Sequence, residues 1–253
     1  MIHDYKHSRS DLETSIRGLA RWFDSSGYYL QELEQDRISR LLPDLFGYHI
    51  LQIGSVIHKH LLDNSRINHK LVSSAVNVPE TGKNPDLYCA NGQLPFASES
   101  IDVVVLPHVL EFEDQPHQLL RETERILIGE GHVIILGFSP VSLWGFCSMF
   151  LKWRQQPPWN SNTISMTRMK DWLTLLDFEI IHYERFFYRP PFNNERLMKR
   201  LAFLEALGHH CWPYFGSVYL LLAKKRVVSL TPIRLQWQTR RRLIATGMIE
   251  PSA

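Results

Sequence analysis

The sequence of 253 residues has few cysteines, little net charge and no long apolar run. Its three cysteines are far apart and fit no zinc-ligand spacing, which excludes a disulfide scaffold and a zinc module and favours a reducing compartment. The most apolar stretch, residues 141–151, is about half the length of a membrane-spanning helix. Residues 1–11 are polar and lack the pattern of a signal peptide. We therefore expect a cytoplasmic protein with no transmembrane segment and no bound metal.

The net charge of +2 is too small to imply nucleic-acid binding by the chain as a whole. Positive charge is concentrated near the end of the chain, where Glu250 is the only acid. The basic residues there are Lys224, Lys225, Arg226, Arg234, Arg240, Arg241 and Arg242. An RNA-associated protein is one hypothesis, although basic ends often serve only solubility. We expect residues 227–253 to form a basic tail.

Apolar residues at helical spacing predict two N-terminal helices, over residues 11–23 and 28–42. Ser25-Ser26-Gly27 separates them. Five short apolar runs then predict strands, over residues 49–53, 70–78, 86–90, 101–106 and 131–138. The last two runs are rich in β-branched residues, which is typical of strands buried on both faces.

Between these two strands, apolar residues recur at helical spacing over residues 119–127. Glu113, Asp114 and Pro116 suit the first turn of this helix, and Gly129 and Gly131 suit its end. A strand, a helix and a strand in succession form a βαβ unit, which builds parallel sheets. Helices over residues 166–176 and 194–207 and strands over 178–183 and 217–223 follow. The predicted fold class is α/β, with a doubly wound, mostly parallel sheet.

Two segments carry a specific likeness to a known family. The first contains Leu94-Pro95-Phe96 and continues through the strand opened by Ile101-Asp102. The second begins at His108-Val109-Leu110-Glu111 and continues through a helix with Glu122 and Arg125 to Gly129 and Gly131. In this order they resemble the second half of the type 11 group of class I S-adenosylmethionine-dependent methyltransferases. The resemblance covers residues 45–140 and continues loosely to residue 226.

The resemblance implies a Rossmann-like fold and a methyltransferase that acts on a small-molecule acceptor. Its cofactor would be S-adenosylmethionine, bound across the carboxyl ends of the strands, where ligands of open α/β sheets lie. The expected organisation is an N-terminal helical cap over residues 1–45, a methyltransferase-like domain over residues 46–226 and the basic tail. The alternative is a non-catalytic relative that serves as a binding or scaffolding protein.

The loop after the first strand is poor in glycine. The family usually has an acid there, followed by alternating glycines that let the backbone approach the ligand closely. In this sequence Gln52 takes the place of the acid, Gly54 and Ser55 follow, and Val56 and His58 replace later glycines. The resemblance implies that Gln52, Gly54 and Ser55 bind the cofactor. In the non-catalytic alternative, Gly54 makes only a turn and the side chains of Val56 and His58 fill the cleft.

The next two loops also lack the acids that the resemblance leads us to expect. After the second strand, Asn77 and Glu80 are the nearest substitutes for a ribose-binding acid. After the third strand, Asn91 can accept a hydrogen bond from the adenine amino group. Gly92 would offer its backbone and Leu94 an apolar wall. A tight turn built on Asn91 and Gly92 is the structural alternative.

Pro107 and His108 follow the fourth strand and are therefore expected to face the cofactor or the substrate. His108 is the candidate catalytic residue, because a histidine can orient a substrate or accept a proton. A purely structural role at the strand end is the alternative. The aromatic segment over residues 142–150 is expected to shape the substrate pocket, and the alternatives are a lid, a patch that contacts lipid or a core helix.

Overall fold

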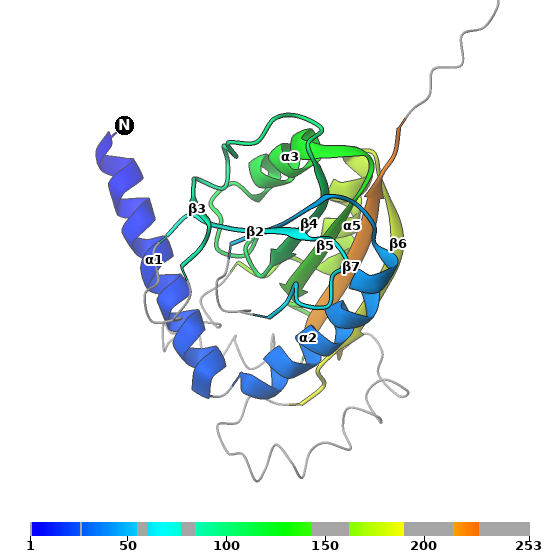
Figure 1. Ribbon diagram of the computed structural model, residues 1–253. Helices are drawn as coiled ribbons and strands as arrows, with labels where there is room; N and C mark the ends of the chain where they lie inside the picture. The colour runs from blue at the N-terminus through cyan, green and yellow to red at the C-terminus, as the bar shows by residue number, and fades with distance from the viewer. Residues whose placement is uncertain are drawn as a thin grey trace, which may run out of the picture.

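The computed structural model describes residues 2–25, 27–54, 60–76, 84–142, 162–189 and 215–227. Within this part of the chain, seven strands form one sheet in the order β3-β2-β1-β4-β5-β7-β6 (Figure 1). The strands are β1 (His49–Ile53), β2 (His69–Ser74), β3 (Leu87–Tyr88), β4 (Ile101–Pro107), β5 (Leu127–Phe138), β6 (Phe178–Phe186) and β7 (Val218–Lys225). Strands β1 to β5 are parallel, and β7 is antiparallel to both of its neighbours. The sheet confirms the predicted α/β fold class.

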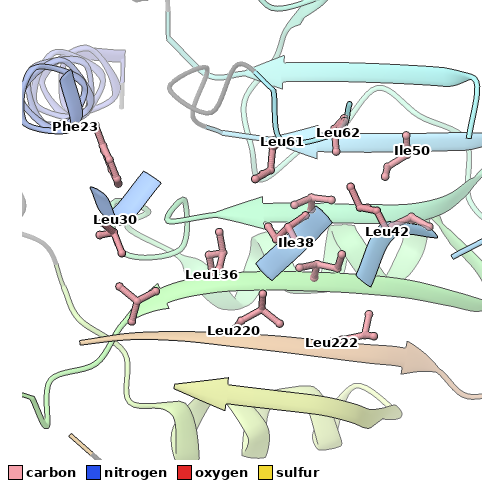
Figure 2. Packing of buried hydrophobic residues seen from close by; sticks show 14 of the residues in the cluster. Phe23, Leu30, Ile38, Leu42, Ile50, Leu61, Leu62, Leu136, Leu220 and Leu222 are labelled. Carbon is pink, nitrogen blue, oxygen red and sulfur yellow. The ribbon is translucent and has the colours of Figure 1, made fainter. Parts of the chain in front are cut away.

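Helices cover both faces of this sheet. The chain begins with α1 (Ile2–Ser25), α2 (Tyr28–Leu41) and the 3-10 turn η1 (Leu42–Asp44). On one face, Leu30 and Ile38 of α2 join a core cluster with Leu136 and Leu220 from the sheet (Figure 2). On the other face, α3 (Pro116–Ile126) and α5 (Met166–Leu175) share a second core cluster. The N-terminal helices therefore pack as part of the folded core.

Strand β4 shows why a β-branched run predicts a central strand. Val103 and Val105 contribute to one core cluster, while Val104 and Leu106 contribute to the other. Every residue of β4 is buried, as expected for a parallel strand with helices on both sides. The bounds of β1 are also as predicted, whereas β2 and β3 are shorter than the runs that predicted them.

The end of α3 differs from the prediction. The helix passes directly into β5 at Leu127, so Gly129 and Gly131 lie within the strand and do not end the helix. A Cβ atom at Gly131 would lie 2.9 Å from the carbonyl oxygen of Ile128 and 3.1 Å from that of Asp102. Glycine at position 131 is therefore explained by close backbone packing against β4.

Some predicted segments lie outside the described residues, namely the helix over residues 194–207 and the tail beyond residue 227. Among the described helices, none has the length and apolar character needed to cross a membrane.

Asp102 connects the starts of two central strands. Its carboxylate accepts hydrogen bonds from the backbone amides of Tyr48, at 2.9 Å, and His49, at 2.8 Å. Replacing Asp102 with alanine should lower the free energy of unfolding by about 1.5–3 kcal/mol, because both bonds to a charged acceptor are lost. Urea denaturation measures this change. The exposed Asp171 of α5 is the control, and equal effects of Asp102→Ala and Asp171→Ala would contradict the assignment.

Candidate functional site

A cleft of about 800 Å³ opens at the carboxyl ends of β2, β3 and β4. Its walls are formed by the segment after β3, by the loop between β4 and α3, and by helix α1. Its described lining residues are Leu12, Ser15, Ala75, Tyr88, Cys89, Ala90, Asn91, Gly92, Gln93, Glu111, Phe112, Glu113, Asp114, Gln115, Gln118 and Asn162. This is the edge of the sheet at which open α/β folds bind ligands.

The structure brings only part of the predicted cofactor set to this cleft. Asn91 and Gly92 line it, while Gly54 and His108 line an adjoining hollow of about 10 Å³. The hollow is also bordered by α1 and by the loop after β4. Three other predicted residues, Gln52, Leu94 and Pro107, are buried and do not line the cleft. Ser55 lies outside the described residues.

Further predicted positions also lie outside the described residues. These are Val56, His58, Asn77, Glu80 and the aromatic segment after Ser142.

Gly54 directly follows β1 and has a conformation that favours glycine. Its φ is +106°, and its amide donates a 2.9 Å hydrogen bond to the carbonyl oxygen of Ser73 in β2. A Cβ atom at this position would lie 2.6 Å from Cβ of Val109. The loop after β4 therefore approaches the end of β1 so closely that no larger residue fits there.

Asn91 places a polar side chain at the β3 side of the cleft. The residue is 3% exposed, and its amide nitrogen donates a hydrogen bond to Oε1 of Glu113. Among the described residues, its buried Oδ1 has no hydrogen-bond partner. An unpaired buried acceptor costs about 1–3 kcal/mol. This atom therefore fits a site that receives a donor from a ligand.

His108 lies between two buried carboxylates. Its Nε2 is 2.9 Å from Oε1 of Glu34 in α2, and its Nδ1 is 3.5 Å from Oε2 of Glu111. The imidazole stacks on Phe138, with 4.2 Å between the ring centroids. The three ionisable side chains are at most 1% exposed, so the group forms a closed ionic triad of Glu34, His108 and Glu111.

The triad fixes the protonation state of His108. Burial alone would lower the pKa of the imidazole, but the charge of Glu34 and the polar contacts with both glutamates outweigh it and raise the pKa to about 10. At neutral pH the ring is protonated and has no lone pair with which to accept a proton. The geometry therefore favours the structural alternative for His108 over the role of general base.

The loop between β4 and α3 gives the cleft an acidic wall. Glu111, Glu113 and Asp114 line it, and none of the described lining residues is a lysine or an arginine. Burial raises the pKa of the Glu113 carboxyl, although the hydrogen bond from Asn91 opposes this shift. Glu113 and Asp114 were predicted in the first turn of α3, but that prediction was wrong because the helix begins at Pro116.

Comparisons with known proteins agree with this architecture. A family model described as a methyltransferase domain matches residues 55–135. The chain is 32% identical over 203 residues to the uncharacterised protein YafS of Escherichia coli (strain K12), an alignment that covers 80% of this chain and 78% of that protein.

Solved structures share the fold at low sequence identity. One is a SAM-dependent methyltransferase of Thermotoga maritima, described as a possible histamine N-methyltransferase, with a TM-score of 0.59 and 17% identity. It matches 82% of this chain and 93% of its own. A SAM-dependent methyltransferase of Archaeoglobus fulgidus has a TM-score of 0.55 and 18% identity, over 77% of this chain and 94% of its own. Both likenesses concern the sheet and its flanking helices.

Proposed function

The chain belongs to the class I S-adenosylmethionine-dependent methyltransferases, and we propose that it transfers a methyl group from S-adenosylmethionine to a small-molecule acceptor. The observation that carries this proposal is the cleft of about 800 Å³ at the carboxyl ends of the parallel strands. Its size suits a nucleoside-containing ligand. In the proposed organisation, residues 1–45 cap residues 46–226, and residues 227–253 form a basic tail.

We assign the two ends of the cofactor to different parts of the site. Asn91 and Gly92 would hold the adenosine end, because the buried Oδ1 of Asn91 requires a donor. Gly54, which lines the hollow beside the cleft, would lie against the methionine end. The roles of Gln52, Ser55, Leu94 and Pro107 in cofactor binding stay predictions. When bound, the cofactor supplies a methyl group on a positively charged sulfur.

The chain would then act mainly by positioning the cofactor and the acceptor and by excluding water from the site. Leu12 and Ile16 of α1 and Phe112 of the loop after β4 form an apolar border around the hollow beside Gly54. The acidic wall of the cleft complements the positive charge of the cofactor. Because His108 is enclosed and charged, it cannot take a proton from the acceptor. Either the acceptor reacts without losing a proton first, or another group removes that proton.

The non-catalytic relative is the second candidate. The observation in its favour is the small hollow beside Gly54, which at about 10 Å³ holds roughly one water molecule. Such a protein would bind a nucleoside in the wider cleft and leave no room for a methionine chain, unless α1 moves.

Calorimetric titration with S-adenosylmethionine and its demethylated product, S-adenosylhomocysteine, tests the proposal. We expect dissociation constants in the micromolar range, about −8 kcal/mol of binding free energy. The thermal midpoint should also rise with ligand concentration. Binding of adenosine without binding of either larger ligand would favour the non-catalytic relative. No heat and no thermal shift at millimolar ligand would refute cofactor binding.

A further inference from the structure

The acidic wall of the cleft originates from an unexpected loop. Gln52 within β1 and Asn91 after β3 are amides at positions where the resemblance leads us to expect acids, and Gln52 does not line the cleft. The carboxylates that line the cleft instead come from the loop between β4 and α3. Of these, Glu111 is turned inward, because its oxygens face Phe138 and His108. Glu113 is the one that reaches the segment after β3.

Glu113 and Asn91 form an acceptor pair across the cleft. The amide nitrogen of Asn91 donates to one oxygen of the Glu113 carboxylate. This bond fixes the orientation of the Asn91 amide group, whose Oδ1 has no hydrogen-bond partner among the described residues. It also orients the carboxylate, whose burial raises its pKa and therefore makes a further donor favourable. The pair thus presents acceptor oxygens to a ligand that carries hydrogen-bond donors.

The buried triad holds this loop in place. His108 adopts a left-handed conformation at the end of β4, with φ of +51°, and its contacts with Glu34 and Glu111 stabilise it. The backbone carbonyl of Glu111 also accepts a 3.0 Å hydrogen bond from the amide of Asn162. Glu113 follows two residues later, so its carboxylate is presented from an anchored loop.

We infer that Glu113 replaces the missing acid after β3 and, with Asn91, recognises the exocyclic amino group of the cofactor's adenine. This inference rests on the proposed function. An amino group offers two hydrogens, which suit two neighbouring acceptors. A purine with an oxygen at the same position would place an acceptor against a carboxylate, so the pair would select adenine over hypoxanthine.

The test compares S-adenosylhomocysteine with S-inosylhomocysteine, which differs by an oxygen in place of the amino group. Calorimetry on the full chain should show that the wild type binds the adenosyl ligand at least about tenfold more tightly. Glu113→Gln should weaken adenosyl binding about tenfold, because a charged acceptor is lost. The same variant should bind the inosyl ligand as well as the wild type or better, since a glutamine amide can donate to the purine oxygen. Selectivity between the two ligands should therefore fall.

Two further variants sharpen this test. Glu32→Gln makes the same chemical change on an exposed position of α2 and should leave both dissociation constants unchanged. Glu113→Asp keeps the charge but shortens the side chain, so it should weaken adenosyl binding without improving inosyl binding. Thermal midpoints without ligand establish that each variant is folded.

The outcomes separate this inference from the function on which it rests. Unchanged selectivity in Glu113→Gln, with a wild type that binds the adenosyl ligand, overturns the role of Glu113 and leaves the methyltransferase proposal standing. Equal weakening of the binding of both ligands also overturns it. Glu113 would then act on the loop or through its charge, without contacting the amino group. A wild type that binds neither ligand overturns both.

Discussion

Replacing His108 with alanine is expected to lower the free energy of unfolding by about 3–5 kcal/mol. The change leaves Glu34 and Glu111 as two carboxylates, at most 1% exposed, with no cation between them. It also removes the ring that stacks on Phe138. Urea denaturation followed by tryptophan fluorescence measures the loss. His108→Gln should lose less, because an amide can still donate to one of the carboxylates.

The pH dependence of the same measurement distinguishes charge from packing. The partners of His108 raise its pKa from 6.5 to about 10 in the folded state. Its stabilising contribution is therefore complete below about pH 6.5 and is lost as the pH rises towards about 10. The difference in stability between wild type and His108→Ala should shrink from about pH 7 to about pH 9. A difference that stays constant with pH would show that the imidazole is uncharged in the fold.

The exposed His182 of β6 provides the matched control for this substitution. His182→Ala should change the free energy of unfolding by no more than about 0.5 kcal/mol, as surface substitutions usually do. If His108→Ala behaved like His182→Ala, the ionic triad would contribute nothing to stability. The anchoring of the loop that carries Glu113 would then need another explanation.

The triad of Glu34, His108 and Glu111 could be predicted from the sequence only in part. Leu30, Glu34 and Ile38 recur every four residues, so a charged residue occupies the centre of the apolar stripe of α2. A charge in such a position needs a partner, and this signal could have identified Glu34 as a special residue. Its partner could not be identified, because His108 is 74 residues away and is brought close only by the packing of α2 on the sheet.

The central strands were predictable for a physical reason. Strands β1 and β4 are short, largely buried apolar runs, and their length and β-branched residues favour a strand over a buried helix. The start of β5 was not predictable, since Gly129 and Gly131 are equally typical of a helix end. Their role depends on the approach of the Asp102 carbonyl oxygen, which is a contact between distant segments.

The sequence predicts the candidate site beyond the carboxyl ends of the strands, and the cleft at that edge is lined by only some of the predicted residues. Asn91 and Gly92 were identified from their place after a strand, and both line the cleft. Glu113 was assigned to a helix because an acid before a proline suits a first turn. No local pattern distinguishes such an acid from one that points across a cleft, so its contact with Asn91 could come only from the structure.

Gly54→Ala is the second change for which we expect a large effect. The residue has φ of +106°, and the added Cβ atom would lie 2.6 Å and 2.7 Å from Cβ and Cγ2 of Val109. Backbone strain and overpacking each cost about 1–3 kcal/mol, so the free energy of unfolding should fall by about 3 kcal/mol. The affinity for S-adenosylhomocysteine should fall at least about tenfold, because the loop after β4 must move away from the end of β1.

Gly92→Ala is the matched control, since it adds the same atom to the other side of the site. Its Cβ atom would meet only the end of the Gln118 side chain, at 3.2 Å, and moving that side chain away breaks one exposed hydrogen bond to the carbonyl oxygen of Gly92. We expect it to keep nearly full stability. The double variant Gly54→Ala/Val109→Ala removes the contact with Cγ2 but keeps the 2.6 Å contact with Cβ of residue 109 and the strained φ, so it should recover only a small part of the lost stability. The single Gly54→Ala variant could be destabilised and still bind S-adenosylhomocysteine with unchanged affinity at temperatures below its thermal midpoint. In that case Gly54 would serve only as a turn. The contact with the methionine end of the cofactor would then have to come from other residues.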